Sequence, residues 1–160
     1  MPGSDPGAER LGAIVAALSI GRADRHLLLC AGQSTPRCSE RDRSLAVWSH
    51  LKRRLKEEGL TSAPPSAAGE RGDGAPASRP GQGRVLRSKV DCLRICEQGP
   101  IAVVYPEGVW YRLVDEAAVD RIVEEHLRGG RVVADLVFAR APLPAGIESP
   151  GGASQDRGSP

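Results

Sequence analysis

The sequence lacks the two features that would recruit nucleic acid or a membrane, which are a strong net charge and a long apolar run. Its 22 basic and 20 acidic residues leave a net charge of only +2. The molecule as a whole therefore has no field that would attract nucleic acid or an anionic membrane surface. The longest apolar stretch, residues 11–20, is too short to cross a bilayer. We expect neither nucleic acid nor a membrane as a partner.

A secretory signal is also missing. The apolar stretch follows Asp5 and Glu9, and Arg10 is the only basic side chain before it. An export signal instead begins with positive charge. The predicted location is therefore the cytoplasm. Cysteines there are more often metal ligands or redox thiols than structural disulfides, because glutathione and thioredoxin keep thiols reduced.

The sequence shows no motif of a common enzyme class. It has no Ser-His-Asp set, no phosphate-binding glycine loop, no paired-carboxylate motif and no internal repeat. We therefore predict no catalytic residues.

Three segments have too few large apolar side chains to offset the entropy of ordering them. They are residues 1–9, 61–83 and 141–160, which are rich in Gly, Pro and Ser. Between them lies enough chain for one modest core. The predicted organisation is a partly disordered N-terminal extension over residues 1–23, one domain over residues 24–140 with a flexible insertion at 61–83, and a disordered tail over 141–160.

The first half of this domain shows two strand patterns and one helix pattern. The apolar run at residues 26–30 predicts a buried strand, and residues 84–90 predict a second strand more weakly. Between Ser44 and Glu58, apolar side chains recur at helical spacing, and Gly59 stands where a C-terminal cap is expected.

The second half predicts a hairpin followed by a helix. Residues 101–105 and 109–114 are β-branched and aromatic runs separated by a Pro-Glu-Gly turn. Asp115 is placed as the N-cap of a second helix that ends at Gly129, and residues 132–138 suggest one more extended segment. The order of elements predicts an α/β fold with a mixed sheet and helices packed on it.

The chain has only four cysteines, Cys30, Cys38, Cys92 and Cys96, arranged as C-x7-C and C-x3-C. Each pair falls in a loop after a predicted strand. If the strands before Cys30 and Cys92 are parallel, their carboxyl ends meet at one edge of the sheet. Thiolates are soft ligands that select zinc, copper(I) or iron-sulfur clusters, and neither pair has the spacing typical of zinc ribbons. The residues alone leave the metal open.

Three stretches, HLLLCAGQSTPRC, KVDCLRICEQGPIAVVYPEGVWY and VDRIVEEHLRGG, closely resemble the thioredoxin-like 2Fe-2S ferredoxins over residues 24–140. The resemblance implies a thioredoxin-like fold and a 2Fe-2S cluster held by all four cysteines. It also implies one-electron transfer to redox protein partners, and it allows a homodimer. Two departures from the family are a shorter gap between the first two cysteines and the lengthening at residues 61–83.

Two other functions stay open. The cysteines could instead hold zinc in a structural or interaction module. Alternatively, the C-x3-C pair could exchange thiols and disulfides as in thioredoxin, although it lacks the two-residue spacing of that family. Gly99-Pro100 either shapes the ligand loop or only starts the next strand.

Charged and histidine residues elsewhere have ordinary structural interpretations. His26, His50 and His126 are assigned no ligand role, because four cysteines complete an all-thiolate cluster. The basic face of the first predicted helix is either a solvated surface or a docking face for an acidic partner. Its members are Lys52, Arg53, Arg54 and Lys56.

Overall fold

A five-stranded sheet forms the centre of the computed structural model, which describes residues 5–62 and 81–144. The strand order is β2-β1-β3-β4-β5. Only β1 and β2 are parallel, and the other neighbours are antiparallel, so the sheet is mixed as predicted. The strands are β1 (Arg25–Cys30), β2 (Val85–Val90), β3 (Ala102–Tyr105), β4 (Val109–Tyr111) and β5 (Val137–Arg140).

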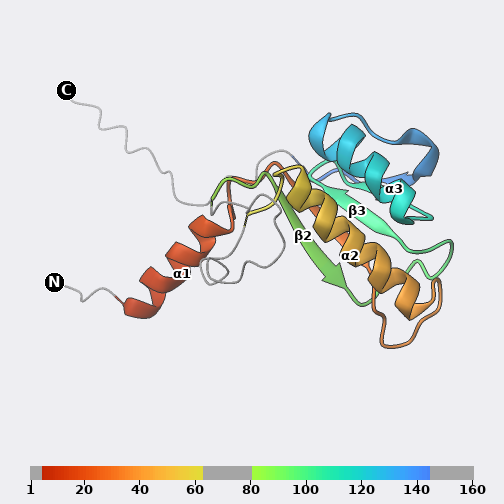
Figure 1. The fold of residues 1–160 in the computed structure, drawn as a ribbon, viewed down its shortest axis with the longest axis horizontal. Coiled ribbons are helices and arrows are strands. Elements are labelled where there is room, and N and C mark those ends of the chain that lie inside the picture. Colours follow the sequence, from red (N-terminus) through yellow and green to blue (C-terminus); the bar gives the residue numbers. More distant parts are fainter. Residues whose placement is uncertain (1–4, 63–80, 145–160) are drawn as a thin grey trace, which may run out of the picture.

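Helices α2 (Arg41–Glu57) and α3 (Glu116–Arg121) pack on one face of the sheet (Figure 1). Helix α2 buries Val47, Leu51 and Leu55, which follow one another four residues apart on one face. The predicted cap of α3 is confirmed, since the Asp115 carboxylate accepts a hydrogen bond of 2.8 Å from the Ala118 amide.

The core lies between these helices and the sheet. Helix α3 continues as a π-helix, Ile122–Arg128, which ends at Gly129 and buries Ile122, Val123, His126 and Leu127. Strands β1, β3 and β4 contribute alternate side chains, as expected when one face is buried, and β2 contributes one. They are Leu27, Leu29, Val85, Ala102, Val104, Val109 and Tyr111.

Several element boundaries differ from the sequence prediction; for example, the strand predicted over residues 109–114 ends at Tyr111. Helix α2 begins at Arg41 rather than Ser44, because the three residues of its first turn are exposed and polar and so carry no apolar pattern. The extended segment expected at residues 132–138 is a short 3₁₀ helix, Ala134–Leu136, followed by β5.

Helix α1 (Pro6–Ala17) was not expected and lies to one side, away from α2 and α3 (Figure 1). The Asp5 side chain caps it by accepting a bond from the Gly7 amide, and Pro6 opens its first turn. Disorder was predicted through Glu9, but residues 6–9 are helical. No helix among the described residues is long and apolar enough to cross a membrane.

The predicted insertion at residues 61–83 has defined flanks. The Ser62 hydroxyl accepts a hydrogen bond of 2.6 Å from the Gly83 amide and lies 2.8 Å from the Ser19 hydroxyl. The Gly81 amide donates to the Ala17 carbonyl over 2.7 Å. These contacts place both ends of the insertion beside the end of helix α1. Residues 63–80 and most of the predicted tail, residues 145–160, lie outside the described residues.

Candidate metal centre

The parallel pairing of β1 and β2 brings the two cysteine loops to one edge of the sheet. Cys30 is the last residue of β1, and it pairs with Val90, the last residue of β2. The loop that contains Cys38 therefore leaves the sheet beside the loop that contains Cys92. The condition set for the two cysteine loops to meet, a parallel pairing of their strands, is therefore fulfilled.

Three of the four cysteines, Cys38, Cys92 and Cys96, line one open cavity of about 540 Å³. The fourth, Cys30, is buried beside it, with its Sγ 3.4 Å from the carbonyl oxygen of Asp91. The Sγ atoms of Cys92 and Cys96 are 3.8 Å apart. The remaining lining residues are Gln33, Thr35, Arg37, Asp91 and Arg94.

The two loops are joined by hydrogen bonds between Ser34 and Asp91. The backbone amide and the hydroxyl of Ser34 both donate to one carboxylate oxygen of Asp91, over 2.7 and 3.0 Å. These bonds lower the pKa of Asp91, because they stabilise its charged form. The charged carboxylate therefore holds the first cysteine loop against the second at neutral pH.

The electrostatics of the cysteines disfavour free thiolates. Burial raises the pKa of the Cys38 thiol, and nearby Cys30 raises it further. The hydrogen bond to Cys92 raises the pKa of the Cys96 thiol. Thiolates that crowd together repel one another, so they need a positive charge between them. A bound metal supplies that charge and deprotonates the thiols that ligate it.

The backbone of the second cysteine loop is held in a strained shape. Arg94, Cys96 and Gln98 have φ values of +66°, +56° and +47°. Side chains disfavour this left-handed region, at a cost of order 1–3 kcal/mol per residue. The Gln98 carbonyl accepts a bond of 2.7 Å from the Leu113 amide, which fixes the end of the loop. The resulting path points the Arg94 amide at Cys92 Sγ over 3.2 Å.

Within the described residues, no three Cys, His, Asp or Glu side chains are grouped as ligands of one metal ion. The close Cys92–Cys96 pair instead has the sulfur separation of two thiolates on one tetrahedral metal, roughly 3.7 Å for metal-sulfur bonds near 2.3 Å. This separation is compatible with Cys92 and Cys96 sharing one metal ion.

Comparison with known proteins gives both sequence and structural relatives. No protein-family model matches the chain. It is 49% identical over 53 residues to a 2Fe-2S ferredoxin from Aquifex aeolicus, which is 33% of this chain and 48% of the relative. It is 49% identical over 59 residues to a 2Fe-2S ferredoxin from Clostridium pasteurianum, which is 37% of this chain and 58% of the relative. The chain thus spans about half the length of the curated relatives it matches.

The fold is similar over a longer range. A solved structure of a thioredoxin-like [2Fe-2S] ferredoxin from Aquifex aeolicus matches with a TM-score of 0.53 and 27% sequence identity, covering 77% of this chain and 97% of that one. The chain is similar in sequence and in fold to the thioredoxin-like 2Fe-2S ferredoxins. The predicted resemblance to this family and the predicted α/β, thioredoxin-like fold class are confirmed.

The three histidines make contacts away from the cysteines. The Nε2 atom of His26 is 2.8 Å from the Ser88 hydroxyl, and that of His50 is 2.8 Å from an Asp120 carboxylate oxygen. The buried His126 bonds to the Tyr111 hydroxyl. Each histidine therefore has a structural contact.

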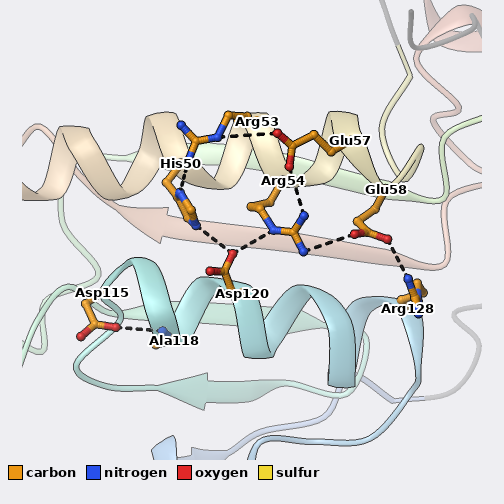
Figure 2. Close-up of polar contacts among 9 residues, drawn as sticks. All are labelled: His50, Arg53, Arg54, Glu57, Glu58, Asp115, Ala118, Asp120 and Arg128. Atoms are coloured by element: carbon orange, nitrogen blue, oxygen red, sulfur yellow. Dashed lines mark hydrogen bonds and ion pairs between the residues drawn. The ribbon is translucent and has the colours of Figure 1, made fainter. Parts of the chain in front are cut away.

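Arg54, which belongs to the basic face of α2, joins this helix to α3 (Figure 2). The Arg54 guanidinium contacts Asp120 on α3 over 2.8 Å, and it also contacts Glu57 and Glu58 over 3.1 and 3.2 Å. His50 bonds to the same Asp120 oxygen. Arg54 therefore has an intramolecular role, which accounts for it without a partner protein.

Two residues of the site were missed from the sequence. Gln33 donates a hydrogen bond to Cys30 Sγ, and Ser34 holds Asp91. Both lie in the segment between the first two cysteines, and this position is the only feature of the sequence that could have indicated them. The partners are 3 and 57 positions away, respectively, so the contacts depend on how the loops fold.

Proposed function

We propose that this chain is a one-electron carrier and not an enzyme, and that Cys30, Cys38, Cys92 and Cys96 together hold a 2Fe-2S cluster. The observation that carries the proposal is the convergence of two cysteine loops at one edge of the sheet. It is supported by relatives that are named 2Fe-2S ferredoxins.

The donor set fits this group. Four cysteine thiolates complete the ligation of a 2Fe-2S cluster, with two thiolates on each iron. The 3.8 Å separation of the Cys92 and Cys96 sulfurs supports these two as the ligands of one iron. Cys30 and Cys38 are then assigned to the other iron. When bound, the cluster accepts and releases one electron.

The chain's own residues tune and expose this site. Cys92 is exposed, so one ligand reaches the surface where a redox partner can approach. Cys30 is buried, which shields the opposite side from water. The Arg94 amide and the Gln33 side chain donate hydrogen bonds to Cys92 and Cys30. Hydrogen bonds to sulfur, burial and local charge are the means by which a protein sets the potential of such a cluster.

The two alternatives have less support. Thiol-disulfide exchange needs a cysteine whose pKa is lowered, so that the attacking thiolate forms at neutral pH. The pKa values of Cys38 and Cys96 are instead raised. A zinc module would use the same four cysteines, but the relatives of similar sequence are named 2Fe-2S ferredoxins.

The full-length protein, purified aerobically, distinguishes these functions. We expect visible absorption bands that bleach with dithionite, and about two iron and two sulfide per chain. A colourless protein with one zinc per chain would establish the zinc module. A metal-free protein whose cysteines cycle between thiol and disulfide would establish the exchange function.

The partners are proposed on the same basis. We place redox proteins over the exposed cysteine loops, with the basic face of α2 and a homodimer as additional contacts that the sequence suggested. The cytoplasm is the proposed compartment. Light scattering during gel filtration measures the oligomeric state, and covalent cross-linking to reductases of the source cell would locate the docking face.

A further inference from the structure

Gln33 is buried against the first cysteine of the site. Its side-chain amide nitrogen donates a hydrogen bond of 3.3 Å to Cys30 Sγ, and the two residues are only 3% and 2% exposed. The other three cysteines differ from Cys30, because they all line the open cavity. Water can donate hydrogen bonds to their sulfurs. The buried Cys30 sulfur lacks this access to water, so the side-chain amide of Gln33 is the polar group that can donate a hydrogen bond to it.

The start of α2 holds Gln33 in place. The hydroxyl of Ser44, which is fully buried, lies 3.2 Å from the Gln33 amide oxygen. The same hydroxyl accepts a bond of 3.0 Å from the Gly32 amide. The Arg41 guanidinium donates to the Gln33 carbonyl over 3.1 Å. Both the side chain and the backbone of Gln33 are therefore fixed before any metal binds.

The chemistry of a ligating cysteine selects this orientation of the amide. A cysteine that binds metal is a thiolate, which accepts hydrogen bonds and donates none. If the amide were reversed, its oxygen would face the negative sulfur. The oxygen end is instead directed at the Ser44 hydroxyl, whose single proton is shared between the Gln33 amide oxygen at 3.2 Å and the Arg41 carbonyl oxygen at 2.8 Å.

We propose that Gln33 is a positioning residue that raises the reduction potential of the site through its hydrogen bond to Cys30. This inference rests on the proposed 2Fe-2S function. An added electron increases the negative charge on the cysteine sulfurs, so a donor hydrogen bond stabilises the reduced state more than the oxidised state. Ser44 acts through Gln33, because it holds the amide in the orientation that donates.

The test is the midpoint potential of the cluster-loaded, full-length protein, measured by a redox titration followed by absorbance. Gln33→Leu removes the donor at similar volume. We expect a lower potential, with about a tenfold change in the oxidised-to-reduced ratio at fixed ambient potential, or about 59 mV for one electron. Ser44→Ala keeps the amide but frees it to turn, so its shift should be smaller and in the same direction.

Gln82→Leu is the matched control. It makes the same substitution at an exposed glutamine that lies outside the cysteine loops and makes no hydrogen bond within the described part of the chain. Its potential should equal that of the unmodified protein. Thermal unfolding of the apoproteins shows whether the variants still fold.

The outcomes separate the two proposals. Unchanged potentials in both Gln33→Leu and Ser44→Ala, with full iron and sulfide content, would overturn the role of Gln33 and leave the proposed function intact. If only Gln33→Leu fails to take up the cluster, the midpoint potential of Ser44→Ala decides. An unchanged potential would overturn the role of Gln33, and a lower potential would support it. If the unmodified protein takes up no iron and sulfide, the proposed function fails and the inference fails with it.

Discussion

Gly99 packs directly against Cys38, so that a Cβ atom at position 99 would stand 2.4 Å from Cys38 Sγ and 3.1 Å from the Cys38 carbonyl oxygen. Contacts this short do not occur between real atoms, and Gly99 is itself buried. Gly99 therefore leaves the space that the sulfur occupies. The structure thus supports a role in shaping the ligand site over the alternative of merely starting β3.

The first prediction is that Gly99→Ala displaces Cys38 and impairs the site. We expect reduced iron and sulfide content, and a loss of about 1–3 kcal/mol in the free energy of unfolding from the overpacked contact. Gly12→Ala is the control, because a Cβ atom at position 12 would have no other described group within 4 Å. It should retain full metal content. Normal iron content in Gly99→Ala would contradict the prediction, because it would show that the loop shifts to fit the added methyl group without impairing metal binding.

This contact also shows what the sequence could not reveal. The hairpin and the placement of the cysteines in loops at strand ends were predicted, because each depends on local spacing or on strand patterns, while the parallel pairing of the two strands entered only as a condition. The contact between Gly99 and Cys38, the hydrogen bond from Gln33 and the link from Ser34 to Asp91 all depend on how two loops meet. Contacts between two loops that are distant in the sequence leave no local pattern from which a single sequence would reveal them.

Helix α1 was missed for a different reason. Leu11 and Val15 are 64% and 40% exposed, so its apolar residues do not form the buried stripe that identifies a helix in a sequence. Its start signal, Asp5 followed by Pro6, lies in a terminal segment rich in Gly and Pro, whose composition favours disorder.

The second prediction concerns the ligands. Replacing any one of the four cysteines by serine should lose or destabilise the cluster, because each thiolate fills one of four coordination positions. Visible absorption and iron and sulfide analysis are the measurements. Ser39→Ala, next to Cys38, is the control and should keep the spectrum. A cysteine whose serine variant keeps full iron, full sulfide and an unchanged spectrum would be excluded from the site.

The third prediction concerns the insertion. Deleting residues 63–80 and joining the flanks through a short Gly-Ser bridge should change the free energy of unfolding by no more than about 1 kcal/mol, because loop length is weakly coupled to stability. The flanks are already close, since Ser62 bonds to the Gly83 amide. A second deletion that also removes Ser62 should be less stable. Loss of metal in the first deletion would show that the segment contributes to the site.

The fourth prediction concerns the buried hydroxyl of Tyr111. It lies 2.8 Å from His126 Nδ1 and accepts a bond of 3.3 Å from the Val133 amide. Tyr111→Phe leaves both groups without a partner inside the core, which should cost about 1–3 kcal/mol in the free energy of unfolding. Tyr105→Phe on the neighbouring strand is the control, because its hydroxyl makes no hydrogen bond in the described ranges. Equal stabilities of the two variants in urea titrations would contradict the prediction.

The last prediction is a pH dependence that arises at His126. Because Val133 already donates to the Tyr111 oxygen, the Tyr111 hydroxyl is free to donate to His126 Nδ1, and the ring proton is then on Nε2, which faces Glu107 at 3.8 Å. Burial lowers the pKa of His126, so the folded protein holds this ring neutral.

The unfolded chain binds a proton at His126 near pH 6.5, above the pKa of the folded state. The stabilisation from the neutral ring is therefore fully present above about pH 6.5 and is lost as the pH falls through the folded pKa. The free energy of unfolding should decrease between pH 7 and 5 with a slope of up to about 1.4 kcal/mol per unit for this residue. His126→Leu should be less stable at pH 7 but should show a shallower slope. The same slope in both proteins would mean that other groups, such as His26, whose pKa is also lowered by burial, carry the dependence.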